Sequence, residues 1–171
     1  MEAESELKYI FANINDWVKF AEAKHGGFLV FNVGLIIGVL SSHSNIYNFI
    51  FKPAMLIGII CFGISVIMSI ISLFPVTQNI FNNKKKIIQS PNLYFFGHLS
   101  RLDNQSFIDE YKMIDTNFTP SKFDTDLINQ ILVNARVAQS KFMFFKISCY
   151  LTVFGLGLIA LSSIIKIIYH F

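Results

Sequence analysis

Charged side chains are scarce in this chain of 171 residues. Asp, Glu, Lys and Arg make up 15% of it, against roughly a quarter of an average soluble domain. None of the four occurs from His25 to Phe51, from Pro53 to Asn83, or from Ile147 to Ile165. Such stretches exclude a water-soluble globule and also a disordered tail rich in charge of one sign.

The sequence also lacks the usual signatures of chemistry. Its two cysteines, Cys61 and Cys149, both lie in uncharged stretches, which excludes a disulfide-stapled secreted module. It contains no H-E-x-x-H, no P-loop, no C-x-x-C and no G-x-S-x-G, and its four histidines are dispersed. A net charge of +3 spread along the chain does not indicate a nucleic-acid partner. We therefore expect no enzyme, no metal site and no resident cofactor.

Three apolar segments are long enough to cross a bilayer, which takes about 20 helical residues. They are Gly26–Ser42, Pro53–Phe74 and Ile147–Ile168. Residues 1–25 have the periodicity of an amphipathic helix, and residues 75–146 form the long connection between the second and third spans. The predicted fold is an all-α membrane protein with three transmembrane helices and a small cytoplasmic helical subdomain.

Basic residues predict the orientation of these spans. The short loop 43–47 contains no Lys or Arg, and nothing basic follows Lys166. The long connection carries Lys84, Lys85, Lys86, Arg101, Lys112, Lys122, Arg136, Lys141 and Lys146. Because cytoplasmic flanks are enriched in Lys and Arg, we expect this connection and the N-terminus in the cytoplasm and the C-terminus outside.

Local signals predict how the cytoplasmic part is built. The apolar face of the N-terminal helix comprises Leu7, Ile10, Phe11, Ile14, Trp17, Val18 and Ala21, and this helix should run directly into the first span. Thr119 is the expected N-cap, with Pro120 at the first position, of a helix that runs into the third span. The two cytoplasmic extensions should pack together and against the segment between them.

That segment contains a second group of local signals. Gly97 would permit an unusual backbone angle after the aromatic run at residues 94–96. Asp103 or Ser106 would cap a short helix. The inner face of this helix would carry Phe107, Tyr111 and Ile114.

Small residues form a stripe along each predicted span. The first span carries Gly27, Gly34, Gly38 and Ser41, the second Ala54, Gly58, Cys61, Ser65, Ser69 and Ser72, and the third Ser148, Thr152, Gly155 and Ser162. Such stripes let helices approach closely, either within one bundle or between copies of the chain, where a stripe would line a weakly polar path. Asn32 lies opposite the glycine stripe and should find a partner on a neighbouring helix or in an oligomer.

The order of these features resembles one known family. An amphipathic helix ends in FAEAKHGG at residues 20–27, and two close spans follow it. The segment NLYFFGHL occupies residues 92–99, and a helix with NAR at 134–136 and KF at 141–142 leads into the last span. Over nearly its whole length the chain is similar to the transmembrane effectors of the Pycsar anti-phage systems, the PycTM family.

The resemblance implies a multi-pass protein of the bacterial inner membrane that acts in antiviral defence. A partner nucleotide cyclase would make a cyclic pyrimidine mononucleotide, cCMP or cUMP, which activates the effector. The effector, expected to form a homo-oligomer, would then impair membrane integrity and cause abortive infection.

Such a ligand offers a phosphate, a ribose hydroxyl and a base, so cationic and amide side chains near aromatic residues are its candidate contacts. They are Arg101 for the phosphate, Asn92 and Asn134 for the base, and Lys24 and Lys141 on the two helical extensions. The same residues can instead be interfacial anchors, ion-pair partners or turn caps. Two other functions stay open: a non-enzymatic assembly subunit of a larger membrane complex, and a small channel subunit.

Overall fold

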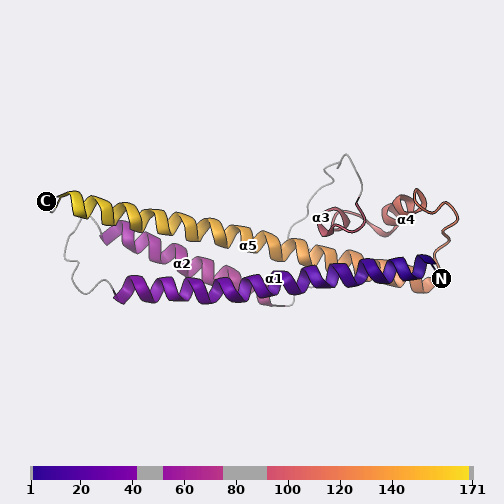
Figure 1. The fold of residues 1–171 in the computed structure, drawn as a ribbon, viewed down its shortest axis with the longest axis horizontal. Helices are drawn as coiled ribbons and strands as arrows, with labels where there is room; N and C mark the ends of the chain where they lie inside the picture. Colours follow the sequence, from indigo (N-terminus) through magenta and orange to yellow (C-terminus); the bar gives the residue numbers. More distant parts are fainter. Residues whose placement is uncertain (1, 42–51, 75–91, 170–171) are drawn as a thin grey trace. The chain divides into compact units, whose positions relative to one another are not determined.

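The structure is a computed structural model, and it describes residues 2–41, 52–74 and 92–169. Within these ranges every regular element is a helix (Figure 1). The helices are α1 (Glu2–Ser41), α2 (Lys52–Leu73), α3 (Phe96–Leu99), α4 (Asn104–Lys112) and α5 (Lys122–Tyr169). Three of them, α1, α2 and α5, contain stretches long and apolar enough to cross a membrane. The predicted fold class is confirmed: an all-α membrane protein with three long apolar helices and a small helical part.

Two sequence features lie outside the described residues. They are the short loop 43–47 and the basic run Lys84–Lys86. The predictions made for them concern orientation in the membrane and stay predictions.

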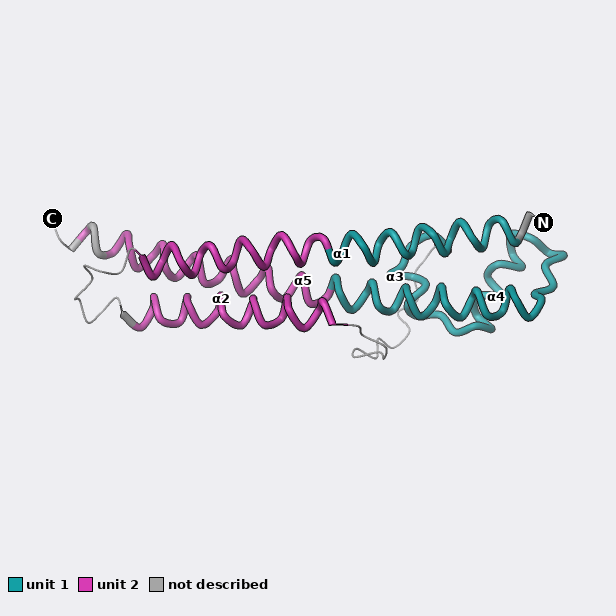
Figure 2. The backbone as a smooth tube through the Cα atoms, turned by 90° about the horizontal axis from the view of Figure 1, so that it is seen from below, with its two compact units in different colours: residues 1–22, 75–142 teal, residues 23–74, 143–171 magenta. Residues whose placement is uncertain are grey.

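The described chain divides into two compact units, coloured separately in Figure 2. Unit 1 comprises residues 1–22 and 75–142, and unit 2 comprises residues 23–74 and 143–171. Helix α1 contributes its first half to unit 1 and its second half to unit 2, and α5 is divided in the same way. The sequence prediction that the N-terminal helix and the helix after Thr119 each continue without a break into an apolar stretch is therefore confirmed.

Helix α5 begins at Lys122, later than predicted. The hydroxyl of Ser121 accepts a hydrogen bond from the backbone N–H of Asp124 at 3.2 Å. The Asp124 carboxylate in turn accepts from the backbone N–H of Ser121 at 2.9 Å. This reciprocal capping satisfies two N–H groups that have no partner inside the helix, so Ser121 and not Thr119 is the N-cap.

Unit 1 is built around an apolar core to which α1, α3, α4 and α5 all contribute. The core contains Leu7, Ile10, Ile14, Leu93, Phe96, Leu99, Phe107, Tyr111, Phe118, Ile128, Ile131, Leu132, Ala135 and Ala138. Phe11, Trp17 and Val18 pack against it, so the predicted apolar face of the N-terminal helix is confirmed. The parts of α1 and α5 that belong to unit 1 thus pack together and against the connecting segment, as their amphipathic patterns predict.

The connecting segment differs from its prediction at two positions. Gly97 lies in the short helix α3, and no glycine in the described ranges has a positive φ angle. An added Cβ at Gly97 would lie 2.4 Å from the ring of Phe95, so a larger residue here would force that ring to move. The Asp103 carboxylate caps α4 by accepting from the N–H of Ser106 at 2.8 Å, as predicted. Ile114 is 75% exposed and not on the inner face, because α4 ends at Lys112.

Unit 2 packs α1, α2 and α5 side by side, and the small residues of α2 and α5 face inward. Helices α2 and α5 approach closely at Gly58 and Gly155: an added Cβ at Gly58 would lie 3.1 Å from the carbonyl oxygen of Gly155. The glycine stripe of α1 behaves differently. Gly34 and Gly38 are exposed, and an added Cβ at either would meet nothing within 4 Å. The stripes of α2 and α5 therefore serve packing within the chain, whereas the stripe of α1 is exposed.

Candidate functional site

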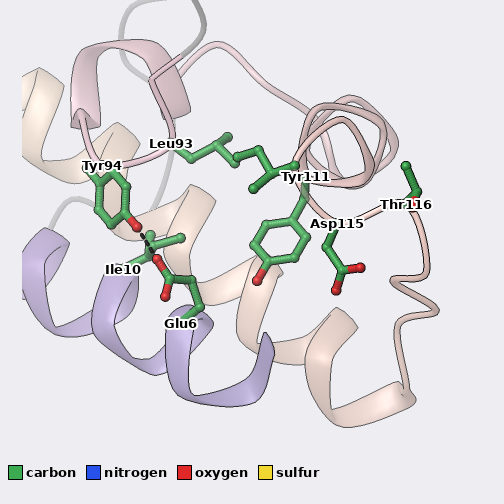
Figure 3. A pocket seen from close by; sticks show the side chains of 8 residues that line it. Glu6, Ile10, Leu93, Tyr94, Tyr111, Asp115 and Thr116 are labelled. Atoms are coloured by element: carbon green, nitrogen blue, oxygen red, sulfur yellow. Dashed lines mark hydrogen bonds between the residues drawn. The ribbon is translucent and has the colours of Figure 1, made fainter. Parts of the chain in front are cut away.

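A cavity of about 500 Å³ opens on the surface of unit 1 (Figure 3). Helix α1 contributes Glu6 and Ile10 to its lining, and the segment before α3 contributes Leu93 and Tyr94. The end of α4 and the residues after it contribute Tyr111, Ile114, Asp115 and Thr116. Its volume lies within the range of about 300–1,000 Å³ that is typical of small-molecule sites.

One side of this cavity is held by a bond between two of its polar residues. The Tyr94 hydroxyl donates a hydrogen bond to the Glu6 carboxylate, joining the segment before α3 to α1. The Asn13 amide adds a second link by donating to the Tyr94 carbonyl oxygen at 2.8 Å. Because the carboxylate stabilises the protonated phenol, the bond raises the pKa of Tyr94 to about 12.

The opposite side of the cavity is built on a buried aromatic cluster. The Tyr111 ring lies 4.5 Å, between centroids, from that of Phe118 and 6.2 Å from that of Phe107. Asp115 follows α4, and its carboxylate accepts from the backbone N–H of Asn117 at 3.0 Å. This local bond fixes the Asp115 side chain beside Tyr111, where Figure 3 shows both at the cavity.

The lining thus combines aromatic surface with hydrogen-bond acceptors. Two carboxylates, of Glu6 and Asp115, contribute acceptor oxygens, and the Thr116 hydroxyl can donate or accept. Among the described lining residues there is no Lys, Arg, His, Asn or Gln. Such a cavity suits a group that carries N–H or O–H donors.

The five sequence-predicted contact residues lie elsewhere, and none belongs to the described lining of this cavity. In unit 1, Lys141 on α5 is almost fully buried and forms an ion pair with Glu22 on α1 at 3.1 Å. The Asn134 amide donates to the side-chain oxygen of Asn15 at 2.7 Å. These two residues therefore connect α5 to α1 within unit 1.

The other three predicted contacts occupy separate environments. Asn92 is exposed, and its side-chain oxygen accepts from the backbone N–H of Tyr94 at 2.9 Å. Arg101 follows α3 in the chain, and its side chain is half-buried. In unit 2, the Lys24 ammonium lies 5.5 Å from the centroid of the Phe145 ring. The roles of all five in ligand binding remain predictions.

Sequence reasoning drew attention to the two tyrosines of the cavity but not to its carboxylates. Tyr94 lies in the aromatic run, and Tyr111 lies on the predicted inner face of α4. Glu6 lies beside the apolar face of an amphipathic helix, where an acidic residue usually contacts water. Asp115 lies in a turn, where Asp is common for local reasons. Only the tertiary structure brings Glu6 and Asp115 to one cavity.

A second polar cluster lies among the apolar helices of unit 2. The Thr152 hydroxyl on α5 donates to the Asn32 side-chain oxygen on α1 at 2.7 Å. The Ser65 hydroxyl on α2 lies 3.0 Å from that of Thr152 and 3.0 Å from the carbonyl oxygen of Ser148. Nearby on the same helices, the Ser72 hydroxyl lies 2.8 Å from Nε2 of His25. All these side chains are buried, so the predicted partner of Asn32 is found on a neighbouring helix of the same chain.

This cluster, the intramembrane polar network, joins all three helices of unit 2. In lipid, a polar side chain that loses its partner has no water to replace it, so such bonds fix one arrangement of the helices. Among the described residues no group of three or more His, Cys, Asp and Glu side chains could hold a metal ion. The network is therefore a set of hydroxyl, amide and imidazole groups without a metal centre in the described chain.

Comparison with known families identifies the chain. The family model "Pycsar effector protein domain", PycTM, matches residues 6–168, which include unit 1 with its cavity and unit 2 with its polar network. The chain belongs to the PycTM family. No curated protein and no solved structure matches it. As a Pycsar effector it acts in anti-phage defence, and its three apolar helices fit a protein of the inner membrane.

Proposed function

We propose that this Pycsar effector responds to a cyclic pyrimidine mononucleotide, cCMP or cUMP, and then impairs the inner membrane, which stops infection before phage are released. A partner cyclase would supply the nucleotide when a phage infects the cell. The protein acts without catalysis: unit 1 receives the nucleotide and unit 2 acts on the lipid.

The observation that supports this proposal is the continuity of α1 and α5. Each is one helix, and each contributes both to the unit with the cavity and to the unit of apolar helices. A ligand can shift a conformational equilibrium only if it binds one state more tightly than the other. If binding favours one packing of α1 against α5 in unit 1, the same helices carry that change into unit 2. A shift from about 1% to 99% active takes about 5.5 kcal/mol of differential binding.

Two contacts within unit 1 are placed to take part in that change. Asn134 bonds to Asn15, and Lys141 pairs with Glu22, so both hold α5 to α1. We keep Lys24, Asn92, Arg101, Asn134 and Lys141 as proposed contributors to the nucleotide response. Alanine substitution of each, with the half-maximal nucleotide concentration as the readout, tests them singly.

Membrane damage by helices of this kind would require more than one copy. Three helices are too few to enclose an aqueous pore by themselves, so we propose a homo-oligomer. The exposed Gly34 and Gly38 on α1 are compatible with close helix–helix contact between copies.

Reconstitution tests the whole proposal. The full chain is placed in liposomes of bacterial lipid that contain a self-quenching dye, and dye release is followed with cCMP, cUMP, cAMP or cGMP. We expect release with a pyrimidine nucleotide and not with the purine nucleotides. Release without any nucleotide would indicate a channel subunit, and no release under any condition would indicate an assembly subunit. Either result would overturn the proposal.

A further inference from the structure

The side chains that line the cavity of unit 1 provide mainly hydrogen-bond acceptors. The polar side chains of its described lining are two carboxylates, two phenols and one threonine hydroxyl, and this described lining contains no cationic side chain. An ionised carboxylate only accepts hydrogen bonds. The cavity therefore favours the part of a ligand that donates hydrogen bonds and disfavours a phosphate, which carries negative charge and acceptor oxygens.

Both carboxylates retain acceptor capacity beyond the bonds they make within the protein. Glu6 accepts from the Tyr94 hydroxyl, and Asp115 accepts from the backbone N–H of Asn117. Each carboxylate has about four lone-pair sites, so these bonds leave room for a ligand. In Figure 3, Glu6 with Tyr94 and Asp115 with Tyr111 lie on two sides of the cavity.

The donors of the two pyrimidine nucleotides differ. Both carry a ribose 2′-hydroxyl, which a carboxylate commonly accepts from in nucleotide sites. Cytosine adds an exocyclic amine, and Asp or Glu is its usual side-chain partner. Uracil has a carbonyl oxygen at the same position, and its base donor is the neighbouring N3–H. A carboxylate placed to accept from the cytosine amine would therefore face the uracil oxygen with no hydrogen between them.

We propose that this cavity receives the nucleoside end of the activating nucleotide, with the phosphate left outside, and that its carboxylates select cytosine over uracil. The inference rests on the proposed function and deepens it by naming cCMP as the preferred ligand. Tyr94 and Tyr111 supply aromatic surface on which a base can stack, a contact that contributes to the affinity of nucleotide sites in general. The carboxylates supply the discrimination between bases.

The test compares cCMP and cUMP on the full chain in the dye-loaded liposomes. We expect the half-maximal concentration for cCMP to be at least about tenfold lower than that for cUMP, as a well-placed base contact provides. Asp115→Asn keeps the oxygen that accepts from Asn117 and places an N–H₂ donor beside it. Glu6→Gln likewise keeps an acceptor for Tyr94. At least one of these variants should reduce the preference for cCMP several-fold, because an amide can donate to the uracil oxygen.

A matched control is Asp109→Asn. Asp109 is an exposed carboxylate on α4 that accepts from Gln105 one turn away at 2.9 Å and does not line the cavity. The Asp109→Asn variant should leave the preference for cCMP over cUMP unchanged. Circular dichroism should show the same helix content in all variants. Equal responses to the two nucleotides, a preference for cUMP, or a preference that neither cavity variant reduces would overturn the inference alone. A wild-type protein that responds to neither nucleotide would instead overturn the proposed function.

Discussion

Single polar side chains determine which arrangement of the apolar helices is stable. Thr152 is central to this, because its hydroxyl contacts partners on both other helices of unit 2: Asn32 on α1 and Ser65 on α2. Thr152 is almost completely buried. Its loss therefore removes the contact that joins all three helices at one point.

We predict that Thr152→Val destabilises the protein by about 0.6–1.7 kcal/mol, the range from average to largest for such bonds in membranes. Valine has nearly the shape of threonine, so the change deletes the hydroxyl with little effect on packing. Thermal unfolding followed by circular dichroism in detergent gives the difference. Ser163→Ala is the control, because Ser163 is exposed and its hydroxyl donates to the Ile159 carbonyl oxygen of its own helix. The Ser163→Ala substitution should change the free energy of unfolding by less than about 0.5 kcal/mol. An equal loss of stability in both variants would contradict a special role for Thr152.

The sequence predicts the contacts of some single residues and not those of others, and the reason can be given for each. Asn32 was predicted to have a helix partner, since an amide in an apolar span must find one. Ile114 and Thr119 were misplaced because periodicity alone does not fix where a helix starts or stops. Asp115 depends on a contact between segments distant in sequence, so local pattern did not reveal its place at the cavity.

Whole helices were more predictable than their ends or their partners. The lengths of the uncharged stretches determined the spans, and the amphipathic patterns predicted that α1 and α5 extend beyond them. Which face of each helix is buried was only partly predictable. The serine stripe of α2 faces inward, whereas Gly34 and Gly38 of α1 are exposed, although both stripes follow the same periodicity. The difference arises because the three helices pack together, and the sequence of one helix does not show which of its faces the other two will cover.

This contrast between stripes gives a prediction about α2. In Gly58→Ala the new methyl group would lie 2.8 Å from the Ile159 side chain and 3.1 Å from the Gly155 carbonyl oxygen. Because a backbone oxygen cannot move aside as a side chain can, α2 and α5 must separate slightly, at a cost of about 1–3 kcal/mol. In Gly34→Ala nothing lies within 4 Å, and the higher helix propensity of alanine should keep or raise stability. Thermal unfolding of the two variants measures this, and a Gly58→Ala protein as stable as Gly34→Ala would show that the close approach is unimportant.

The proposed function of the whole molecule depends on the side of the membrane that unit 1 occupies. A nucleotide made in the cytoplasm reaches the cavity only if unit 1 lies there. The basic residues of the connection between the second and third spans favour that side.

Cysteine labelling of whole cells tests this orientation. Met113 lies in unit 1 just after α4 and is 77% exposed, so Met113→Cys presents a thiol to solvent. A membrane-impermeant maleimide should leave it unlabelled in intact spheroplasts and label it after lysis. Ser44→Cys, in the loop that the sequence places outside, should be labelled in intact spheroplasts. The native Cys61 and Cys149 lie on the apolar helices of unit 2, and the unsubstituted chain provides their background. Labelling of Met113→Cys in intact spheroplasts would place the cavity outside the cell, where a cytoplasmic cyclase cannot supply its ligand.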